Sequence, residues 1–177
     1  PDIILGFKNT LIVAIIATIL ATTLGTLLAV GITRFQRSTT IEAIALMPAI
    51  FPDLALAIGL LILFNLLYLP LGLHSVIISH ALFCAAFVTA IVRARLLQLD
   101  PALEEAAEDL GDSAVGRFFR ITLPSIKPAV IAGALLSFTL SIDEFVIPFF
   151  TNGPNSPTLP IVIYSMVRFG VSPEINA

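Results

Sequence analysis

The chain has 177 residues, of which 58% are apolar and 12% charged, and its mean hydropathy is +1.04. A soluble domain carries about 25% charged residues, so nine basic and twelve acidic side chains are too few to cover the surface of a water-soluble globule. This composition argues against a soluble enzyme and a disordered chain, and the net charge of −3 argues against a nucleic-acid partner.

Three long stretches, 9–33, 54–92 and 145–167, contain no charged residue. About 20 helical residues cross the hydrocarbon core of a bilayer. The sequence therefore predicts an all-α, polytopic transmembrane helical bundle in a lipid bilayer. We expect four complete spans, at about residues 11–33, 41–69, 74–92 and 128–150.

Small side chains recur at every fourth position in the first and third spans. They are Ala21, Gly25 and Ala29 in the first span, and Ala81, Ala85 and Thr89 in the third. Small residues at this spacing let two helix backbones approach closely in lipid. The single cysteine, Cys84, lies in the third span and is expected to be a packing residue.

The second span contains Pro48 and Pro52, and both are expected to kink or break it because proline removes a backbone donor. Asn65 and Tyr164 are expected to form hydrogen bonds between buried helices. Residues 159–169 are apolar but too short to span reliably, which predicts an interfacial or re-entrant helix.

Lysine and arginine predict the orientation, because basic loops stay on the cytoplasmic side. Seven of the nine basic residues fall in the first and third loops, and the second loop has none. These seven are Arg34, Arg37, Arg93, Arg95, Arg117, Arg120 and Lys127, whereas Lys8 and Arg168 fall on the other side. The amino-terminal end is therefore expected outside, and the loop 93–127 inside.

The loop 93–127 contains several residues that typically begin or end helices. Asp100-Pro101 predicts a helix start, Gly111 predicts its end, and Ser113 can cap a second short helix. Both helices are amphipathic. From these features alone, two interpretations stay open: a solvated loop whose apolar face packs on the bundle, and a docking element for a cytoplasmic partner.

The same loop carries Glu105-Ala106-Ala107, then Gly111, then Ile121-x-Leu123-Pro124 without gaps. This pattern resembles the EAA loop of the membrane subunits of ATP-binding-cassette (ABC) importers, apart from Asp112, where that loop usually has alanine. The resemblance implies a MetI-like permease core whose coupling helices, within the loop 93–127, sit in a cleft of an ATPase subunit. It implies that Glu105, Ala106, Ala107 and Gly111 make this contact.

A narrower resemblance covers the carboxyl-terminal third. Residues 141–151 (SIDEFVIPFFT), Gly153-Pro154, Thr158-Leu159-Pro160 and 163–177 are similar to spermidine/putrescine permease subunits. The resemblance implies polyamine import across a bacterial inner membrane. The implied partners are ATPase subunits, a second homologous permease and an extracytoplasmic solute-binding protein. No cofactor or catalytic residue is implied. Family members usually have six spans, so residues 1–177 are expected to be one permease domain that lacks the first and last spans.

Acidic residues within the predicted spans are the candidates for a substrate pathway. Ionisable groups are costly in a membrane and usually face a cavity or a partner. Asp53, Asp143 and Glu144, with Ser141 one turn earlier, are expected to line the path of a polycation. As alternatives, Asp143 or Glu144 caps a helix or pairs with Arg168, and Asp53 satisfies the backbone broken at Pro52.

Three other functions remain as alternatives. The first is an importer for another solute, such as ferric ion or thiamine. The second, a self-sufficient channel or secondary transporter, would have no need of the loop around Glu105. The third, an intramembrane enzyme, is disfavoured because the sequence has no His-Glu-x-x-His or Gly-x-Ser-x-Gly pattern. No metal site is expected, since His74 and His80 are six residues apart and lie on different helix faces.

Overall fold

The computed structural model describes residues 2–34 and 39–169, and every regular element in these two ranges is helical. The predicted all-α fold is therefore confirmed. In chain order the elements are α1 (Asp2–Arg34), α2 (Thr39–Ile50), α3 (Asp53–Leu66), α4 (Leu73–Leu96), α5 (Ala102–Asp109), α6 (Ala114–Arg117), the π-helical turn η1 (Phe118–Thr122), α7 (Leu123–Asp143), α8 (Val146–Thr151) and α9 (Leu159–Phe169). Arg37 and residues 170–177, used above for orientation and resemblance, lie outside the described residues.

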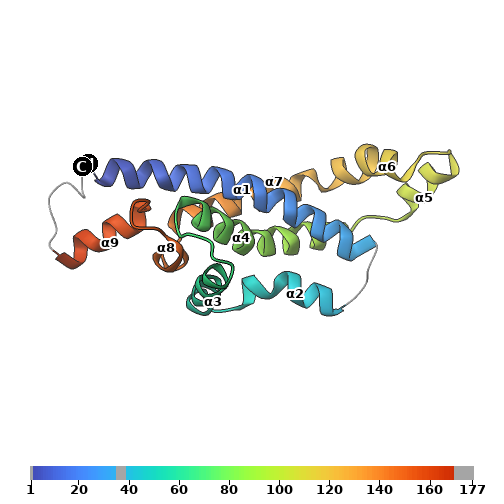
Figure 1. Cartoon of the computed structure of the whole chain (residues 1–177). Coiled ribbons are helices and arrows are strands. Elements are labelled where there is room, and N and C mark those ends of the chain that lie inside the picture. Colours follow the sequence, from blue (N-terminus) through green and yellow to red (C-terminus); the bar gives the residue numbers. More distant parts are fainter. Residues whose placement is uncertain (1, 35–38, 170–177) are drawn as a thin grey trace.

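Within the described ranges, three helical segments are long and apolar enough to cross a membrane: Ile3–Arg34, Leu73–Leu96 and Ala114–Asp143. They pack on one another as the centre of the molecule, with α1 and α7 both against α4. The amino-terminal end of α1 lies at the same end as α9, and the α5–α6 pair lies at the opposite end (Figure 1). This architecture is that of a multi-pass membrane protein.

The close approach of α1 and α4 depends on the small residues predicted to permit it. Ala21 and Ala29 are fully buried, and a Cβ atom added to Gly25 would stand 2.6 Å from the Cβ of Val88. The Thr89 hydroxyl donates to the Ala85 carbonyl at 2.7 Å and also lies 3.3 Å from the carbonyl of Gly25. The predicted stripes of small residues therefore face each other across one helix contact.

The second predicted span is not one kinked helix. It divides at Phe51–Pro52 into α2 and α3, whose axes differ by 107°. Pro48 is accommodated within α2, so Pro52 marks the break. In Figure 1, α3 runs across the direction of α1 and α4, and it packs on α8. If this bent pair is one span, the total is four.

Asn65 does not join two helices as predicted. Its side-chain amide donates to the Leu61 carbonyl, 2.9 Å away in the same helix, and the residue is exposed. A side-chain amide within a helix can reach the backbone carbonyl four residues earlier in the same helix. This local hydrogen bond satisfies the donor without a partner helix. The prediction was therefore wrong for Asn65.

The fourth span was predicted at 128–150, and both limits were wrong. The helical segment begins at Ala114, passes through η1 and ends at Asp143. Glu144 is extended (φ −67°, ψ 124°). Pro148 has no N–H to bond the carbonyl of Glu144 four residues earlier, and its ring would clash with that carbonyl in a continuous helix. Residues 146–151 therefore form the separate helix α8.

Helix α9 has 11 residues and is shorter than the spanning helices, as expected. It packs along the amino-terminal part of α1. The Asn9 amide donates to the Pro157 carbonyl at 2.9 Å, and the backbone N–H of Leu159 donates to the Thr10 hydroxyl at 2.8 Å. These bonds fix the segment before α9 to the end of the bundle opposite α5 (Figure 1).

Candidate functional site

The predicted helix signals of the loop 93–127 are confirmed. The Asp100 carboxylate accepts the backbone N–H of Ala102 at 3.0 Å at the start of α5. Gly111, just after α5, has φ +83°, a conformation that glycine adopts without strain. The Ser113 hydroxyl accepts the backbone N–H of Gly116 at 3.1 Å and caps α6.

Ion pairs stabilise the α5–α6 pair and its connection to η1. Arg117 lies 3.3 Å from the Glu108 carboxylate and also donates to the Asp112 carbonyl at 3.0 Å. Arg120 donates to the Asp112 carboxylate at 3.0 Å. Asp112, where the EAA loop usually has alanine, thus ties the link between the two helices to Arg120 of η1, and the Glu108–Arg117 pair joins α5 to α6 directly.

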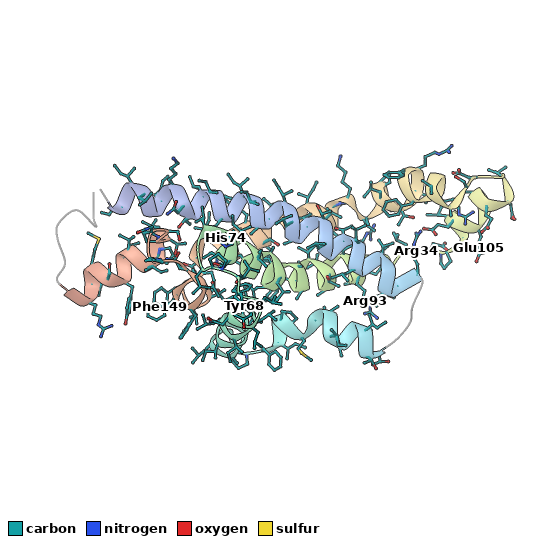
Figure 2. The ribbon with its side chains drawn as sticks, in the orientation of Figure 1. Arg34, Tyr68, His74, Arg93, Glu105 and Phe149 are labelled. Carbon is teal, nitrogen blue, oxygen red and sulfur yellow. The ribbon has the colours of Figure 1, made fainter. Side chains whose placement is uncertain are left out.

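The predicted coupling residues lie on the outside of this helix pair. Glu105, Ala106 and Gly111 are exposed and Ala107 is half-buried. Glu105 stands at the far end of the molecule, on α5 (Figure 2). A shallow pocket of about 360 Å³ lies beside them and is lined by Ala107, Leu110, Gly111, Asp112 and Arg120.

The apolar side chains of these helices do not all pack on the bundle. Leu110 is 89% exposed, Val115 68% and Leu103 56%. Phe118 does pack on the core, against the cluster that contains Ile126 and Val92. The α5–α6 pair therefore has an exposed apolar surface, which the bundle-packing interpretation does not predict.

The three acidic residues of the proposed pathway come from neighbouring elements. Asp53 is the first residue of α3, Asp143 is the last of α7, and Glu144 lies in the link to α8. The charges of Asp53 and Asp143 both act on the carboxyl group of Glu144. In this chain Asp53 and Asp143 are exposed and Glu144 is half-buried. The arrangement therefore concentrates negative charge where α3, α7 and α8 meet.

Glu144 also has a structural role. Its carboxylate accepts the backbone N–H of Ile147 at 3.1 Å and so caps α8. The capping alternative considered above is thus realised for this residue. A capping carboxylate retains other lone pairs, so this bond leaves Glu144 able to bind a cation.

Ser141 does not share the exposure of the acids. It is 2% exposed, and its hydroxyl lies 2.7 Å from Nδ1 of His80. Cys84 is fully buried in the same α4–α7 contact, with its thiol 3.6 Å from the Ser137 carbonyl, as a packing residue would be. Within the described ranges, no group of three or more histidine, cysteine or acidic side chains is arranged to hold a metal ion.

An aromatic cluster next to the acids was not predicted. The ring centroid of Phe145 lies 4.9 Å from that of Tyr164 and 5.4 Å from that of Phe149. Phe149 and Tyr164 are both partly exposed, and Phe149 is labelled in Figure 2. The four-residue spacing of Phe145 and Phe149 was visible in the sequence, but the approach of Tyr164 from α9 was not.

Comparison with known proteins identifies the family. Residues 21–173 match the family described as binding-protein-dependent transport system inner membrane component. The match covers most of the chain, and the chain belongs to this family. This agrees with the EAA pattern around Glu105 and with the membrane-spanning helices.

Curated relatives are similar over nearly the whole chain. The putrescine transport system permease protein PotI of Escherichia coli K12 is 43% identical over 176 residues, which covers 94% of this chain. The spermidine/putrescine transport system permease protein PotC of the same strain is 42% identical over 172 residues, covering 96% of this chain. PotC of Haemophilus influenzae is 38% identical over 167 residues and 93% of this chain. The chain spans 63–65% of the length of these relatives.

Proposed function

We propose that residues 1–177 are one permease domain of an ATP-driven importer that moves polyamines, such as spermidine and putrescine, across a bacterial inner membrane. The names of PotI and PotC support this substrate class. In this proposal the chain is not an enzyme, and a separate ATPase subunit hydrolyses ATP. A second homologous permease completes the pathway, and an extracytoplasmic binding protein delivers the substrate.

The convergence of Asp53, Asp143 and Glu144 is the observation that carries the substrate assignment. A polyamine is a flexible chain with several ammonium groups, and carboxylates on adjoining elements can bind these groups in turn. The charges of Asp53 and Asp143 both act on Glu144, so a cation that binds beside Glu144 relieves repulsion there. Ser141, buried against His80, holds the end of α7 that carries Asp143.

The aromatic cluster supports the same class of substrate. An ammonium group is attracted to the face of an aromatic ring within about 6 Å of its centroid. Phe145 directly follows Glu144, and the partly exposed rings of Phe149 and Tyr164 lie beside it. Carboxylates with adjacent rings suit an alkylammonium chain better than an anion or a hydrated metal ion.

The α5–α6 pair is the proposed contact with the ATPase subunit and lies on the cytoplasmic side. Its exposed apolar residues, including Leu110, and the surface formed by Glu105, Ala106, Ala107 and Gly111 support this role. The Glu108–Arg117 pair between α5 and α6, with the Asp112–Arg120 pair between their link and η1, supports movement as one unit, which a coupling element needs.

The test is reconstitution of the full-length subunit with its ATPase, second permease and binding protein in proteoliposomes. Labelled spermidine and putrescine should enter only with ATP and the binding protein. Excess unlabelled polyamine should compete, whereas ferric ion and thiamine should not. Competition by thiamine or ferric ion, with none by polyamines, would contradict the substrate class. Uptake by the subunit alone would indicate a channel or secondary transporter.

Glu105 tests the coupling assignment separately. Glu105→Ala should abolish polyamine uptake, because it removes an exposed charge from the proposed ATPase contact. Asp109→Ala on the same short helix is the matched control, since that exposed carboxylate is not among the proposed contacts. Normal uptake with Glu105→Ala, or an equal loss with Asp109→Ala, would show that the assignment to Glu105 is wrong.

A further inference from the structure

A three-residue cluster links the α5–α6 pair to the end of α1. The Arg34 guanidinium, in the last turn of α1, donates from one nitrogen to both the Glu104 carboxylate and the Thr122 hydroxyl. The Thr122 hydroxyl in turn donates to the same Glu104 oxygen at 2.6 Å. We call Arg34, Glu104 and Thr122 the clasp. Arg34 is labelled close to Glu105 in Figure 2, where the end of α1 approaches α5.

The three residues of the clasp come from three different elements, α1, α5 and η1. Helix α5 packs on α6 and η1 rather than on α1. A pocket of about 490 Å³ lies beside the clasp, between α1, the end of α4 and the α5–α6 pair; Arg34, Leu97, Pro101, Glu104 and Arg117 are among its lining residues. Beside this pocket, the clasp makes a direct polar connection between α5 and α1.

Burial makes this connection stronger than an ordinary surface ion pair. Thr122 is fully buried, and the side chains of Arg34 and Glu104 are 24% and 31% exposed. Hydrogen bonds between charged groups are stronger than neutral ones, particularly where water is partly excluded. An isolated pair at full exposure would contribute little.

The clasp also joins two parts that are each held together by contacts of their own. The Glu108–Arg117 ion pair holds α5 to α6, Asp112 ties their link to Arg120 of η1, and the contact at Gly25 holds α1 to α4. The clasp therefore offers a direct path from α5 to α1, besides the path that runs through η1 and α7.

From this geometry we propose that Arg34, Glu104 and Thr122 are positioning residues that transmit movement of the coupling helices to α1. This rests on the proposed function as an ATP-driven permease. Arg34 does not touch the substrate or the ATPase in this assignment. It sets the angle and distance of α5 relative to the first spanning helix.

Arg34→Ala and Glu104→Ala, each in the assembled full-length transporter, test this role. Both should lower polyamine uptake per ATP hydrolysed by about fivefold or more, the range of ordinary coupling energies, while the ATPase still co-purifies. The control is Arg93→Ala or Glu42→Ala, because these residues form a similarly shielded ion pair at 2.7 Å that does not reach α5. Loss of transport with unchanged ATP hydrolysis is a result that general unfolding would not give.

Charge exchange and a distance measurement complete the experiment. Arg34→Glu or Glu104→Arg alone should lower polyamine uptake per ATP hydrolysed, and the two changes combined should recover part of that loss. Spin labels at Leu28→Cys and Leu103→Cys, both exposed positions on α1 and α5, should give a broader distance distribution when Arg34→Ala is added. Thr122→Val, which keeps the side-chain volume and removes the hydroxyl, repeats the test if Arg34→Ala reduces assembly.

An unchanged ratio of uptake to hydrolysis with Arg34→Ala and Thr122→Val would overturn the proposal. So would an equal loss with Arg93→Ala, or an unchanged distance distribution. Failure of the proposed function gives a different pattern, since the wild-type transporter itself would then show no ATP-driven polyamine uptake. The distance measurement would still report on the clasp in that case.

Discussion

The carboxylate of Glu144 accepts the backbone N–H of Ile147 at 3.1 Å, so a residue of the proposed pathway also caps the helix that follows it. Glu144→Gln keeps an oxygen acceptor for this bond and removes the charge, whereas Glu144→Ala removes both. We expect both variants to lose polyamine uptake. Only Glu144→Ala should also lose stability, by about 0.5–2 kcal/mol, the usual cost of a lost cap.

Thermal unfolding of the purified full-length subunit and uptake in proteoliposomes separate these two effects. Wild-type uptake with Glu144→Gln would show that the carboxylate acts only as a cap. Equal unfolding temperatures for the two variants would show that the cap contributes little.

Gly25 should be far less tolerant of substitution than Gly31 in the same helix. A Cβ at position 25 would stand 2.6 Å from Val88 and 2.8 Å from the Ala85 carbonyl, whereas position 31 has nothing within 4 Å. Gly25→Ala should therefore destabilise the subunit by about 1–3 kcal/mol, the usual cost of overpacking. Gly31→Ala should be neutral or stabilising by up to about 1 kcal/mol, because alanine favours the helix. Equal unfolding temperatures for the two variants would contradict the α1–α4 contact.

Ser141→Ala should destabilise the α4–α7 contact. His80 is 1% exposed, and Nδ1 of its ring has the Ser141 hydroxyl 2.7 Å away. Removal of that hydroxyl leaves a buried polar atom without its partner, which costs about 1–3 kcal/mol. Ser141→Thr, which retains a hydroxyl, is the comparison. An unfolding temperature as high as the wild type for Ser141→Ala would show that this hydrogen bond contributes nothing measurable.

Cysteine labelling should determine the orientation of the chain. Leu110→Cys on the α5–α6 pair and Tyr68→Cys between α3 and α4 are 89% and 94% exposed positions. In intact cells that express the full-length subunit without its ATPase, a membrane-impermeant maleimide should label position 68 and not position 110. Cys84 is fully buried and should stay unlabelled. The reverse labelling would invert the orientation predicted from the basic residues.

The features that sequence predicted well are those with local causes. Small residues four apart identify a close helix contact wherever the partner lies, as Gly25 shows. Capping depends on neighbours in the chain, so Asp100, Gly111 and Ser113 could be assigned directly. The helix end at Asp143 also had a local cause, which is Pro148, four residues after Glu144. The sequence after Asp143 is strongly apolar, however, and this favoured the prediction of a continuous span.

Features that depend on distant packing were not predicted. The 107° angle between α2 and α3 accompanies the packing of α3 on α8, which proline positions do not reveal. Arg34 and Glu104 are 70 residues apart. In the sequence, Arg34 is only a charge that predicts orientation and Glu104 only one acid among several on an amphipathic helix.

Polyamine uptake by the Asp53→Asn, Asp143→Asn double variant tests the proposed substrate pathway most directly. Both residues are exposed in this chain, and neither is the residue that caps α8, so the change removes negative charge and leaves that cap in place. We expect uptake driven by ATP and the binding protein to fall roughly tenfold or more, equivalent to at least about 1.4 kcal/mol, while the transporter still assembles and hydrolyses ATP. Uptake equal to that of the wild type would contradict the claim that these carboxylates form the path of the polycation.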